Sequence, residues 1–474
     1  MILLGRAVPR AAVTAAGLLC CGALVTGCGA ESGGGGDARP SGKPTASPAA
    51  LPVWKGATAP VPRGDGSKLG SDLNGDGYGD LLLSTGQNGM ASFAVVYGSK
   101  DGLDPATRTV FTDAGPAPRS TGDLDGDGYA DLVVTPGAAP GIVWGGSGGP
   151  DPAAAATPLP EPGGRDFLSA AVTAGDFDGD GHTDLALRAV DDPEGASRRL
   201  EVRYGPFGRN GAAARTDTSY RLPPGTYGNI IDLTAADVNG DAATDLVVTP
   251  DSDGEQVTSV LLFGARQAGG RFPASAHTLP VGSAVTAGDF DGDGLDDLAV
   301  ADSGSRNTED DGGGGRADLA PIVVVRGARG SFDEPADRAV PGSDGLGLRL
   351  AAADLDGDGK AELITQYASD VDAIMPSDLK GVVVLRGTAD GPSGEIRTLR
   401  ISGPERHGGR KLKPYDRRVW VSAGGSYGPG GSDQVVVSWA YKFAPAQWWV
   451  IGDLAAQQGF VLPAGTLEHA SEGE

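Results

Sequence analysis

The sequence predicts an all-β fold, namely a seven-bladed β-propeller with four antiparallel strands in each blade. An acidic loop of nine residues recurs six times, with starts 51, 53, 61, 52 and 65 residues apart. Internal repeats of such a period are typical of propellers, solenoids or arrays. A short apolar β run follows each loop, as in DLVV after the second. The 79 Gly and 34 Pro favour many turns over long helices.

Residues 1–28 are expected to be a targeting segment. Arg6 and Arg10 precede an apolar run over 11–25 that is too short to span a bilayer comfortably. Small residues then lead to Cys28, a pattern that resembles the lipobox of bacterial lipoproteins. The resemblance implies cleavage before Cys28, acylation of that residue and anchoring at a membrane surface. An ordinary secretory signal that is cut elsewhere is the alternative.

The segment after Cys28 has the composition of a linker. Residues 29–60 are rich in Gly, Pro, Ser and Ala without periodicity, which predicts a flexible tether, and residues 61–474 are assigned to the propeller. Cys20 and Cys21 lie within the apolar run, so the mature chain is expected to form no internal disulfide. The net charge of −24 argues against nucleic acid as a partner, because a phosphate backbone requires a basic surface.

Each acidic loop offers oxygen side chains at positions 1, 3, 5 and 9, and Gly stands at position 6 in five of the six copies. Calcium takes six to eight oxygen ligands, and an alternating Asp/Asn loop wraps such ligands around one point. The side chains at position 7 share no chemistry, as expected if that residue contributes its backbone carbonyl. We therefore expect up to six Ca²⁺ ions. The expected ligands, loop by loop, are Asp72, Asn74, Asp76, Tyr78 and Asp80; Asp123, Asp125, Asp127, Tyr129 and Asp131; Asp176, Asp178, Asp180, His182 and Asp184; Asp237, Asn239, Asp241, Ala243 and Asp245; Asp289, Asp291, Asp293, Leu295 and Asp297; and Asp354, Asp356, Asp358, Lys360 and Glu362.

Two other calcium-binding architectures fit the loops less well. An EF-hand needs a bidentate Glu at position 12 and flanking helices, but position 12 holds Leu, Val or Thr and a β run follows every copy. A calcium-binding β-helix has abutting motifs instead of this longer period. Solvated acidic turns without metal are the remaining alternative, and six copies in register argue against coincidence.

The rest of each repeat supplies four strands. One short strand leads into the loop, a second leaves it, a third usually ends at Gly as in FAVVYGS, and a weaker fourth follows. A seventh copy emerges when the β run at 433–437 is aligned with the others. This alignment places Gly425, Tyr427, Pro429 and Gly431 at loop positions 1, 3, 5 and 7. We expect this copy to keep the blade and to lose the metal.

The DxDGDGxxDL loop between two strands resembles the FG-GAP repeat of the integrin α-chain N-terminal β-propeller and the related FG-GAP or VCBS repeats of bacterial secreted proteins. The resemblance covers nearly the whole chain after the tether. It implies calcium at Asp72, Asn74, Asp76 and Asp80 and at the matching places of the next five loops. It also implies a propeller that binds a macromolecule.

Three long insertions, at 303–320, 366–380 and 404–418, are expected on the face opposite the calcium loops, where they suit ligand binding. The last insertion is basic in an acidic chain, so it could bind an anionic glycan or a partner protein. The alternative is that its Arg residues pair with acids and that the nearby Trp residues belong to the blade core. The candidate patch is Arg406, Arg410, Lys411, Lys413, Arg417, Arg418 and Trp420.

No catalytic residue is predicted. Two GxSxG matches lack the strand-to-helix turn of a nucleophile elbow, and no HExxH, Walker or dinucleotide motif occurs. The sequence favours an extracytoplasmic calcium-binding propeller that serves as a surface binding or adhesion module and touches the membrane through its lipid anchor only, or is otherwise secreted. A polysaccharide-active propeller enzyme and a scaffold subunit of an envelope complex are the alternatives.

Overall fold

A computed structural model describes twenty segments of the chain. They are residues 58–84, 93–112, 118, 120–135, 140–160, 171–189, 199–222, 229–252, 255–265, 269–273, 276–303, 320–329, 338–347, 349–366, 382–399, 406–407, 410–411, 417–441, 444–452 and 457–460. The predicted signal peptide and nearly all of the predicted tether lie outside these segments. Within them, no helix is long and apolar enough to cross a membrane.

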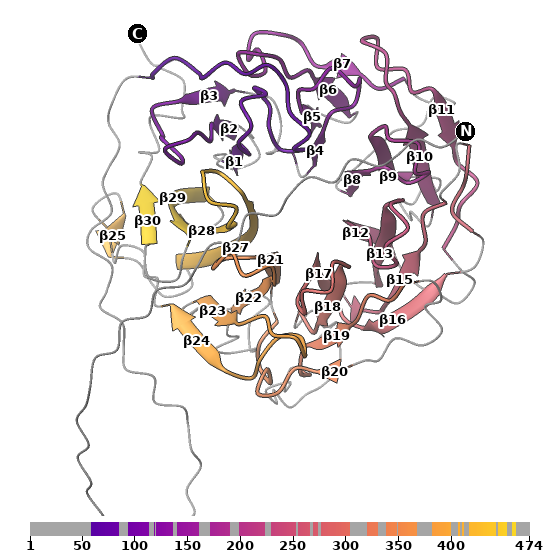
Figure 1. Cartoon of the computed structure of the whole chain (residues 1–474), viewed down its shortest axis with the longest axis vertical. Coiled ribbons are helices and arrows are strands. Elements are labelled where there is room, and N and C mark those ends of the chain that lie inside the picture. The colour runs from indigo at the N-terminus through magenta and orange to yellow at the C-terminus, as the bar shows by residue number, and fades with distance from the viewer. Residues whose placement is uncertain are drawn as a thin grey trace, which may run out of the picture. The chain divides into compact units, whose positions relative to one another are not determined.

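Seven antiparallel sheets follow one another around a ring, which confirms the predicted propeller (Figure 1). Blades 1 to 3 comprise β1 (Leu81–Ser84), β2 (Phe93–Val96) and β3 (Arg108–Phe111); β4 (Thr121–Gly122), β5 (Asp131–Val134), β6 (Gly141–Val143) and β7 (Thr157–Pro158); and β8 (Val172–Gly175), β9 (Asp184–Ala189), β10 (Arg199–Tyr204) and β11 (Arg215–Asp217). Blade 4 comprises β12 (Asn229–Ala236), β13 (Asp245–Ser252), β14 (Glu255–Gln256), β15 (Thr258–Leu262) and β16 (His277–Val281).

The second half of the ring repeats the pattern. Blades 5 and 6 comprise β17 (Ala284–Gly288), β18 (Asp297–Ala301), β19 (Val323–Val325) and β20 (Arg338–Ala339); and β21 (Ala351–Ala353), β22 (Glu362–Gln366), β23 (Val382–Leu385) and β24 (Ile396–Leu399). A two-stranded hairpin of β25 (Arg406–His407) and β26 (Arg410–Lys411) precedes blade 7, which comprises β27 (Arg417–Gly425), β28 (Gln434–Tyr441), β29 (Ala444–Ile451) and β30 (Gln457–Phe460).

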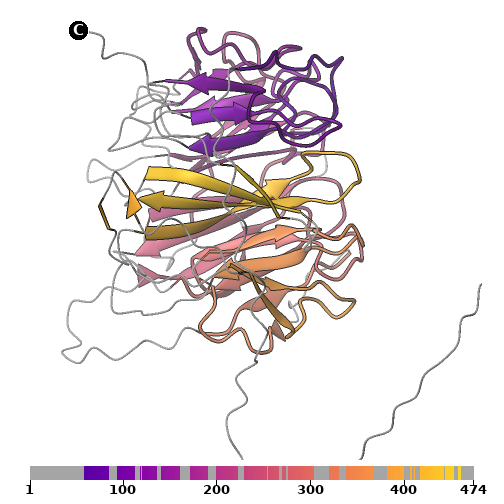
Figure 2. The same ribbon diagram turned by 90° about the vertical axis from the view of Figure 1, so that its left-hand side faces the viewer.

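The strands within a blade lie side by side in chain order, and the first strands of successive blades contact one another around the centre. The strands run from one face of the ring towards the other (Figure 2). In blade 1 the described residues form three strands, and the chain before its loop is irregular. There Gly64 donates its N–H to the carbonyl of Asn74 over 3.1 Å, so this entry segment rests on the first acidic loop.

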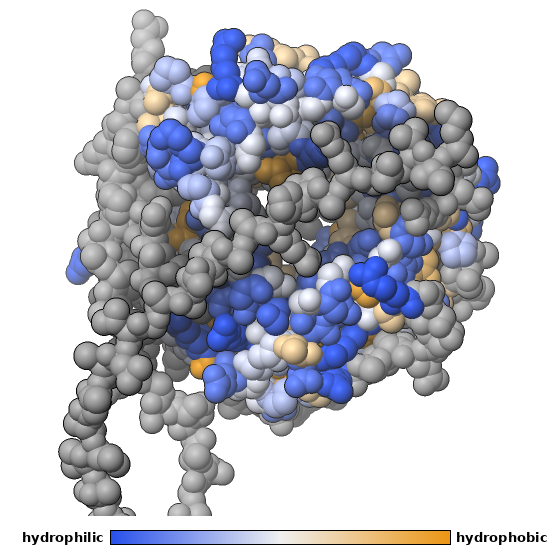
Figure 3. Space-filling view, in the orientation of Figure 1, coloured by the Kyte–Doolittle hydropathy of each residue, from blue (hydrophilic) through white to orange (hydrophobic). Residues whose placement is uncertain are grey.

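The hydrophobic core lies between blades. Along β9, Leu185 and Leu187 pack with blade 2, whereas Ala186 packs with blade 4. Both faces of a sheet are therefore covered, which explains why the second strands are continuous apolar runs instead of alternating ones. The described surface facing the viewer in Figure 3 is mostly hydrophilic. Within the described segments, Leu69 and Val281 are the exposed large hydrophobic residues.

The predicted register of the seventh loop is wrong by one residue. Gly425 pairs with Gln434 in blade 7, as Gly122 pairs with Asp131 in blade 2. Position 9 is therefore Gln434, and position 1 is Ser426. Tyr427, Pro429 and Gly431 occupy positions 2, 4 and 6 instead of the predicted 3, 5 and 7, and Gly425 directly precedes the loop. Asp433 occupies position 8, where its carboxylate accepts the N–H of Asp354 in blade 6. Matching acid to acid in the sequence misled the alignment, because backbone pairing sets the register.

Candidate metal centres

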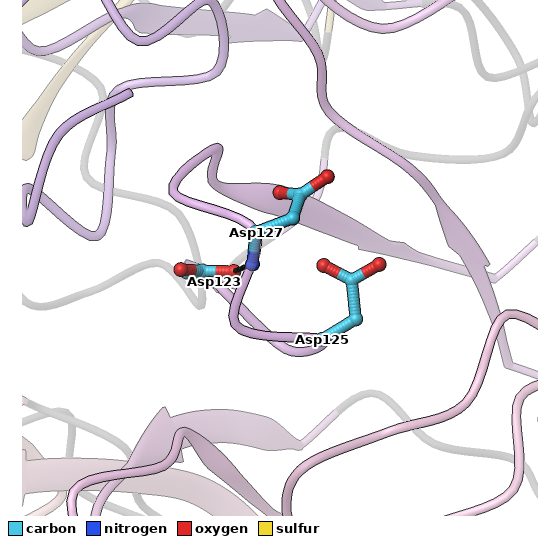
Figure 4. Close-up of side chains that lie close together, drawn as sticks. All are labelled: Asp123, Asp125 and Asp127. Carbon is cyan, nitrogen blue, oxygen red and sulfur yellow. Dashed lines mark hydrogen bonds between the residues drawn. The ribbon is translucent and has the colours of Figure 1, made fainter. Parts of the chain in front are cut away.

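Each acidic loop folds around its own first carboxylate. In the second loop, Asp123 Oδ1 accepts the N–H groups of Gly126 and Asp127 over 2.9 and 3.0 Å, and Oδ2 accepts that of Gly128 over 2.9 Å. Figure 4 shows the Asp123, Asp125 and Asp127 side chains projecting from this tight turn. Gly126 and Gly128 have φ angles of 76° and 91°, a region that favours Gly. The spacing of Asp and Gly therefore produces the turn locally.

The carboxylate at position 9 joins the loop to the third strand. Asp131 Oδ2 accepts the N–H of Leu124 over 2.9 Å, and Oδ1 accepts that of Gly145, just after β6, over 2.8 Å. This residue is completely buried. The same two bonds recur in the other five acidic loops. Gly is present after the third strand because its backbone lies directly against the loop.

Burial raises the pKa of these carboxylates. Desolvation brings the pKa to about 7 at position 9 of loops 2 to 6, and it outweighs the backbone hydrogen bonds that stabilise the ionised form. The residues concerned are Asp131, Asp184, Asp245, Asp297 and Glu362. The pKa of Asp80 in loop 1 is raised well above its ordinary value for the same reason.

Four loops bring three carboxylates together closely enough to hold a metal ion, with one oxygen from each residue lying within 4.8 Å of the others. The groups are Asp123, Asp125 and Asp127; Asp176, Asp178 and Asp184; Asp289, Asp291 and Asp297; and Asp354, Asp356 and Glu362. The other two loops have the amides of Asn74 and Asn239 at position 3. Across the six loops the donors are carboxylate and amide oxygens, which suit a hard divalent cation.

Position 3 supplies a test of whether a cation fits. Asn74 Oδ1, Asp125 Oδ1 and Asp178 Oδ1 are all buried and have no hydrogen-bond partner. An unsatisfied buried oxygen is costly and calls for a ligand. These three atoms occupy the same position in three successive loops, so the donor set fits a cation held inside the turn.

Position 7 varies in burial as well as in chemistry. Leu295 and Ala243 are buried, whereas His182 is exposed. In every loop the backbone N–H of position 7 donates to the carboxylate at position 5, as Tyr129 does to Asp127 over 3.1 Å. The backbone conformation at position 7 is therefore shared while the side chain is not.

Arginine partners of the loops were not predicted from the sequence. Among the described residues, four guanidinium groups form ion pairs with loop acids, namely Arg209 with Asp125 and Asp127, Arg215 with Asp178, Arg326 with Asp291, and Arg386 with Asp356 and Asp358. The Arg-Gly pair that ends the third strand in blades 5 and 6 is a sequence signal for two of them. Arg209 pairs with Asp127 from 82 residues away, so no local pattern reveals it.

The predicted ligand patch is only partly described. Arg406 and Lys411 are exposed on the β25–β26 hairpin. Trp420 lies in β27, and the guanidinium of Arg349 sits 4.1 Å from the centre of its ring. The backbones of Arg410, Arg417 and Arg418 belong to β26 and β27. Lys413 and residues 304–319 and 367–380 of the long insertions lie outside the described residues.

On the face opposite the acidic loops, connections between strands of neighbouring blades are hydrogen-bonded to one another. Gln256 Oε1, in the connection between the second and third strands of blade 4, accepts the N–H groups of Ser283 and Ser303 over 3.2 and 3.1 Å. Ser283 enters blade 5, and Ser303 follows its second strand. Connections of neighbouring blades are thus tied together on this face.

The FG-GAP-like repeat family matches three stretches of the chain, residues 72–134, 123–187 and 289–365. Each stretch starts at position 1 of an acidic loop and reaches the β run after the next loop. The chain is an FG-GAP-repeat β-propeller. In the FG-GAP propeller the matched stretches fall in blades 1 to 3, 5 and 6.

No curated protein matches the chain. Among solved structures, the FG-GAP propeller is similar to a Synechocystis apocarotenoid oxygenase mutant at 9% identity, with 85% of this chain and 93% of that chain covered and a TM-score of 0.38. The exotype rhamnogalacturonan lyase YesX shares 13% identity, with 83% and 76% covered and a TM-score of 0.27. The Vibrio cholerae biofilm matrix protein Bap1 shares 11%, with 84% and 75% covered and a TM-score of 0.21. These scores are too low to transfer an activity or a ligand.

Proposed function

We propose that the protein is an extracytoplasmic, calcium-binding FG-GAP propeller that serves as a binding or adhesion module at the cell surface. The observation that carries the calcium part is the set of buried, unpartnered oxygens at position 3 of successive loops. A cation in each turn would satisfy these atoms and offset the repulsion among the carboxylates.

Calcium suits the loops better than magnesium does. Calcium accepts six to eight oxygens in flexible geometry, whereas magnesium demands a compact octahedron and keeps several of its waters. The loop offers side-chain oxygens at four positions and a carbonyl at position 7. The chemistry that calcium supplies here is structural, because each ion would tie the first strand of a blade to the second and third.

The location and the partner complete the proposal. The predicted lipobox at Cys28 supports anchoring at the outer face of the membrane, with the tether of residues 29–60 holding the propeller away from it. We place the macromolecular ligand, a protein or a glycan, on the face opposite the acidic loops. The exposed Arg406 and Lys411 support an anionic ligand there.

Thermal unfolding with and without chelator tests the calcium part. A ligand that binds only the folded state stabilises it by about 2.7 kcal/mol per site at a hundredfold excess over Kd. We therefore expect EDTA to lower the melting temperature by many degrees, and we expect added calcium to restore it more effectively than magnesium. An identical melting curve in EDTA and in calcium would contradict the proposal.

Ligand capture tests the surface part. Glycan arrays and pull-downs from membranes should detect a partner with the full chain, and the Arg406→Ala/Lys411→Ala double variant should lose it. The exposed Lys100, which lies beyond the end of β2, provides the control, because Lys100→Ala removes a positive charge outside the patch. Equal binding by all three proteins would argue against a role for this patch.

A further inference from the structure

The acid at position 3 and the arginine partners occur together. Four loops have Asp at position 3, and in each of them an arginine forms an ion pair with that Asp. The other two loops have Asn74 and Asn239 there, and no described arginine forms an ion pair with an acid of either loop. Arg329 approaches Gly240 of loop 4 but forms no ion pair there in the described part of the chain. Among the described residues, each acidic loop therefore has either Asp at position 3 with an arginine partner or Asn at position 3 without one.

The guanidinium reaches the loops by two different routes. In blades 5 and 6 it belongs to Arg326 and Arg386, each directly before the Gly that ends the third strand. Blades 2 and 3 have Trp144 and Tyr204 at that place. There, the guanidinium carbon of Arg209 lies 4.7 Å from the centre of the Trp144 ring, and that of Arg215 lies 3.3 Å from the centre of the Tyr204 ring. Unrelated residues thus bring a positive charge to equivalent places.

In loops 2 and 3 the arginine leaves one oxygen of the position-3 carboxylate available to a cation. Arg215 pairs with Oδ2 of Asp178 at 2.9 Å, whereas Oδ1 of Asp178 remains buried without a partner. Arg209 likewise pairs with Oδ2 of Asp125, and Oδ1 of Asp125 remains buried without a partner. One carboxylate can therefore bind the guanidinium and a cation at the same time, so the arginine does not substitute for the metal.

Counting charges shows what the pairing achieves. At ligand positions 1, 3, 5 and 9, a loop with Asn at position 3 has three carboxylates, whereas a loop with Asp there has four carboxylates and one paired guanidinium. Both combinations leave a net charge of −3. Loop 6 has one further positive group, Lys360, whose Nζ lies 3.5 Å from Asp358. At the ligand positions and their paired arginines, the first five loops therefore present the same charge to a cation despite different ligand sets. Loop 5 has one further carboxylate outside the ligand set, Asp296 at position 8, which accepts the N–H of Asp237.

We propose that these arginines are charge-matching, positioning residues that hold the position-3 carboxylate and bring the Asp-type cation sites to the affinity of the Asn-type sites. The inference rests on the proposed cation binding. It predicts that removing only the arginine charge strengthens cation binding, that removing only the Asp charge weakens it, and that removing both restores it. If the ion pair had a purely structural role, removing the arginine and removing the Asp charge would not change cation affinity in opposite directions.

Loop 2 offers the sharpest test. Terbium serves as the probe, with luminescence excited through Tyr129 at position 7, in a Tyr78→Phe background that removes the equivalent sensitiser of loop 1. In this background Arg209→Gln should raise terbium affinity roughly three- to tenfold, and Asp125→Asn should lower it by a similar factor. The double variant Asp125→Asn/Arg209→Gln should lie within about twofold of the background protein, and displacement by calcium should follow the same order.

The outcomes separate this inference from the proposed function. If the background protein binds terbium but Arg209→Gln weakens binding, or the double variant binds more weakly than both single variants, the charge-matching role is overturned while cation binding stands. No binding by the background protein would overturn both. If a loop 2 variant fails to fold, Asp291→Asn and Arg326→Gln in loop 5 provide the same double-mutant cycle, with cation binding followed through the calcium dependence of Tm. Arg326→Gln should then strengthen calcium binding, Asp291→Asn should weaken it, and the double variant should restore it.

Discussion

At the scale of single residues, the acidic loops show how backbone conformation constrains sequence. Position 6 has a positive φ angle in every loop, and Gly occupies it in five of them. Ala242 occupies it in loop 4, with φ at 69°. A left-handed conformation costs an L-residue about 1–2 kcal/mol, so loop 4 stores strain that the other loops avoid.

Ala242→Gly is expected to stabilise the protein by about 0.5–1 kcal/mol, because relief of strain exceeds the added freedom of the unfolded chain. Gly181→Ala provides the matched control, since Gly181 holds the same place in loop 3 with φ at 88° and a Cβ there would meet no neighbouring atom. That change should destabilise by a similar amount. Chemical denaturation measures both, and a destabilising Ala242→Gly would show that Ala242 is not strained.

The buried ion pair of β10 is a second feature at this scale. The side chains of Glu201 and Arg203 are each 2% exposed, and their charged atoms lie 2.5 Å apart. Breaking a buried pair by removing one partner leaves a charge without compensation in a low-dielectric surrounding. The two residues face the core between blades 2 and 3, because their neighbours Leu200 and Val202 face blade 4.

Glu201→Gln is therefore expected to cost about 3–5 kcal/mol of unfolding free energy. Asp101→Asn is the control, because Asp101 pairs with Lys100 where both side chains are more than three-quarters exposed, and such pairs contribute little. Denaturant titration compares the two variants. Equal stability of Glu201→Gln and Asp101→Asn would show that the buried pair is not needed.

At the scale of the elements, the loops link each blade to the next. The N–H at position 8 donates to the carbonyl at position 1 of the preceding loop, as Ala130 does to Asp72 over 2.9 Å and Ala361 to Asp289 over 2.7 Å. The buried acid at position 9 follows directly. The loop is therefore both a candidate metal site and a joint between blades, so its protonation state bears on the stability of the ring.

The raised pKa values predict a pH dependence for the cation-free protein. Carboxyls with an ordinary value of 3.8 in the unfolded chain have values of about 7 in the fold, as for Asp131, Asp184 and Asp245. Between these values the native state binds more protons than the unfolded state, so raising the pH costs stability. In EDTA, unfolding free energy should fall as pH rises from about 4 to about 8.

Saturating calcium should remove this slope, because a cation favours the ionised carboxylates. Asp184→Asn should flatten the slope in EDTA by deleting one of the titrating groups. Urea denaturation across the pH range provides the measurement. A cation-free protein that gains stability with rising pH over this interval would show that the position-9 acids are ionised in the fold.

At the scale of the whole molecule, the ring closes through non-covalent contacts between blades 7 and 1. Gly79 and Ser99 donate their N–H groups to the carbonyls of Ser426 and Tyr427 over 2.9 and 3.2 Å. The Tyr427 side chain is buried in a cluster that includes Leu81 of blade 1. The seventh loop thus keeps the joint although it has no carboxylate at positions 1, 3, 5 and 9.

Tyr427→Ala is expected to destabilise by about 3–5 kcal/mol and to open the ring at this junction. Phe177→Ala, at the same loop position in blade 3, should cost a similar free energy without opening, because the chain connects blades 3 and 4 through a short segment and keeps them close. Small-angle scattering distinguishes the two, since only the Tyr427 variant should expand. If both variants are fully folded and give identical scattering profiles, the blade 7–blade 1 junction is not the place where the ring opens.

The sequence by itself determined the repeating loop, the strands beside it and the seven-bladed ring, because the spacing of Asp and Gly shapes each turn locally and the strand periodicity follows directly. Tertiary structure alone decided the register of blade 7, where backbone pairing places Gln434 at position 9. It also decided which arginine meets which loop, since Arg209 and Asp127 are distant in the chain and become neighbours only when blades 2 and 3 pack. Contacts within a turn depend on adjacent residues, whereas contacts between blades depend on how the whole ring closes.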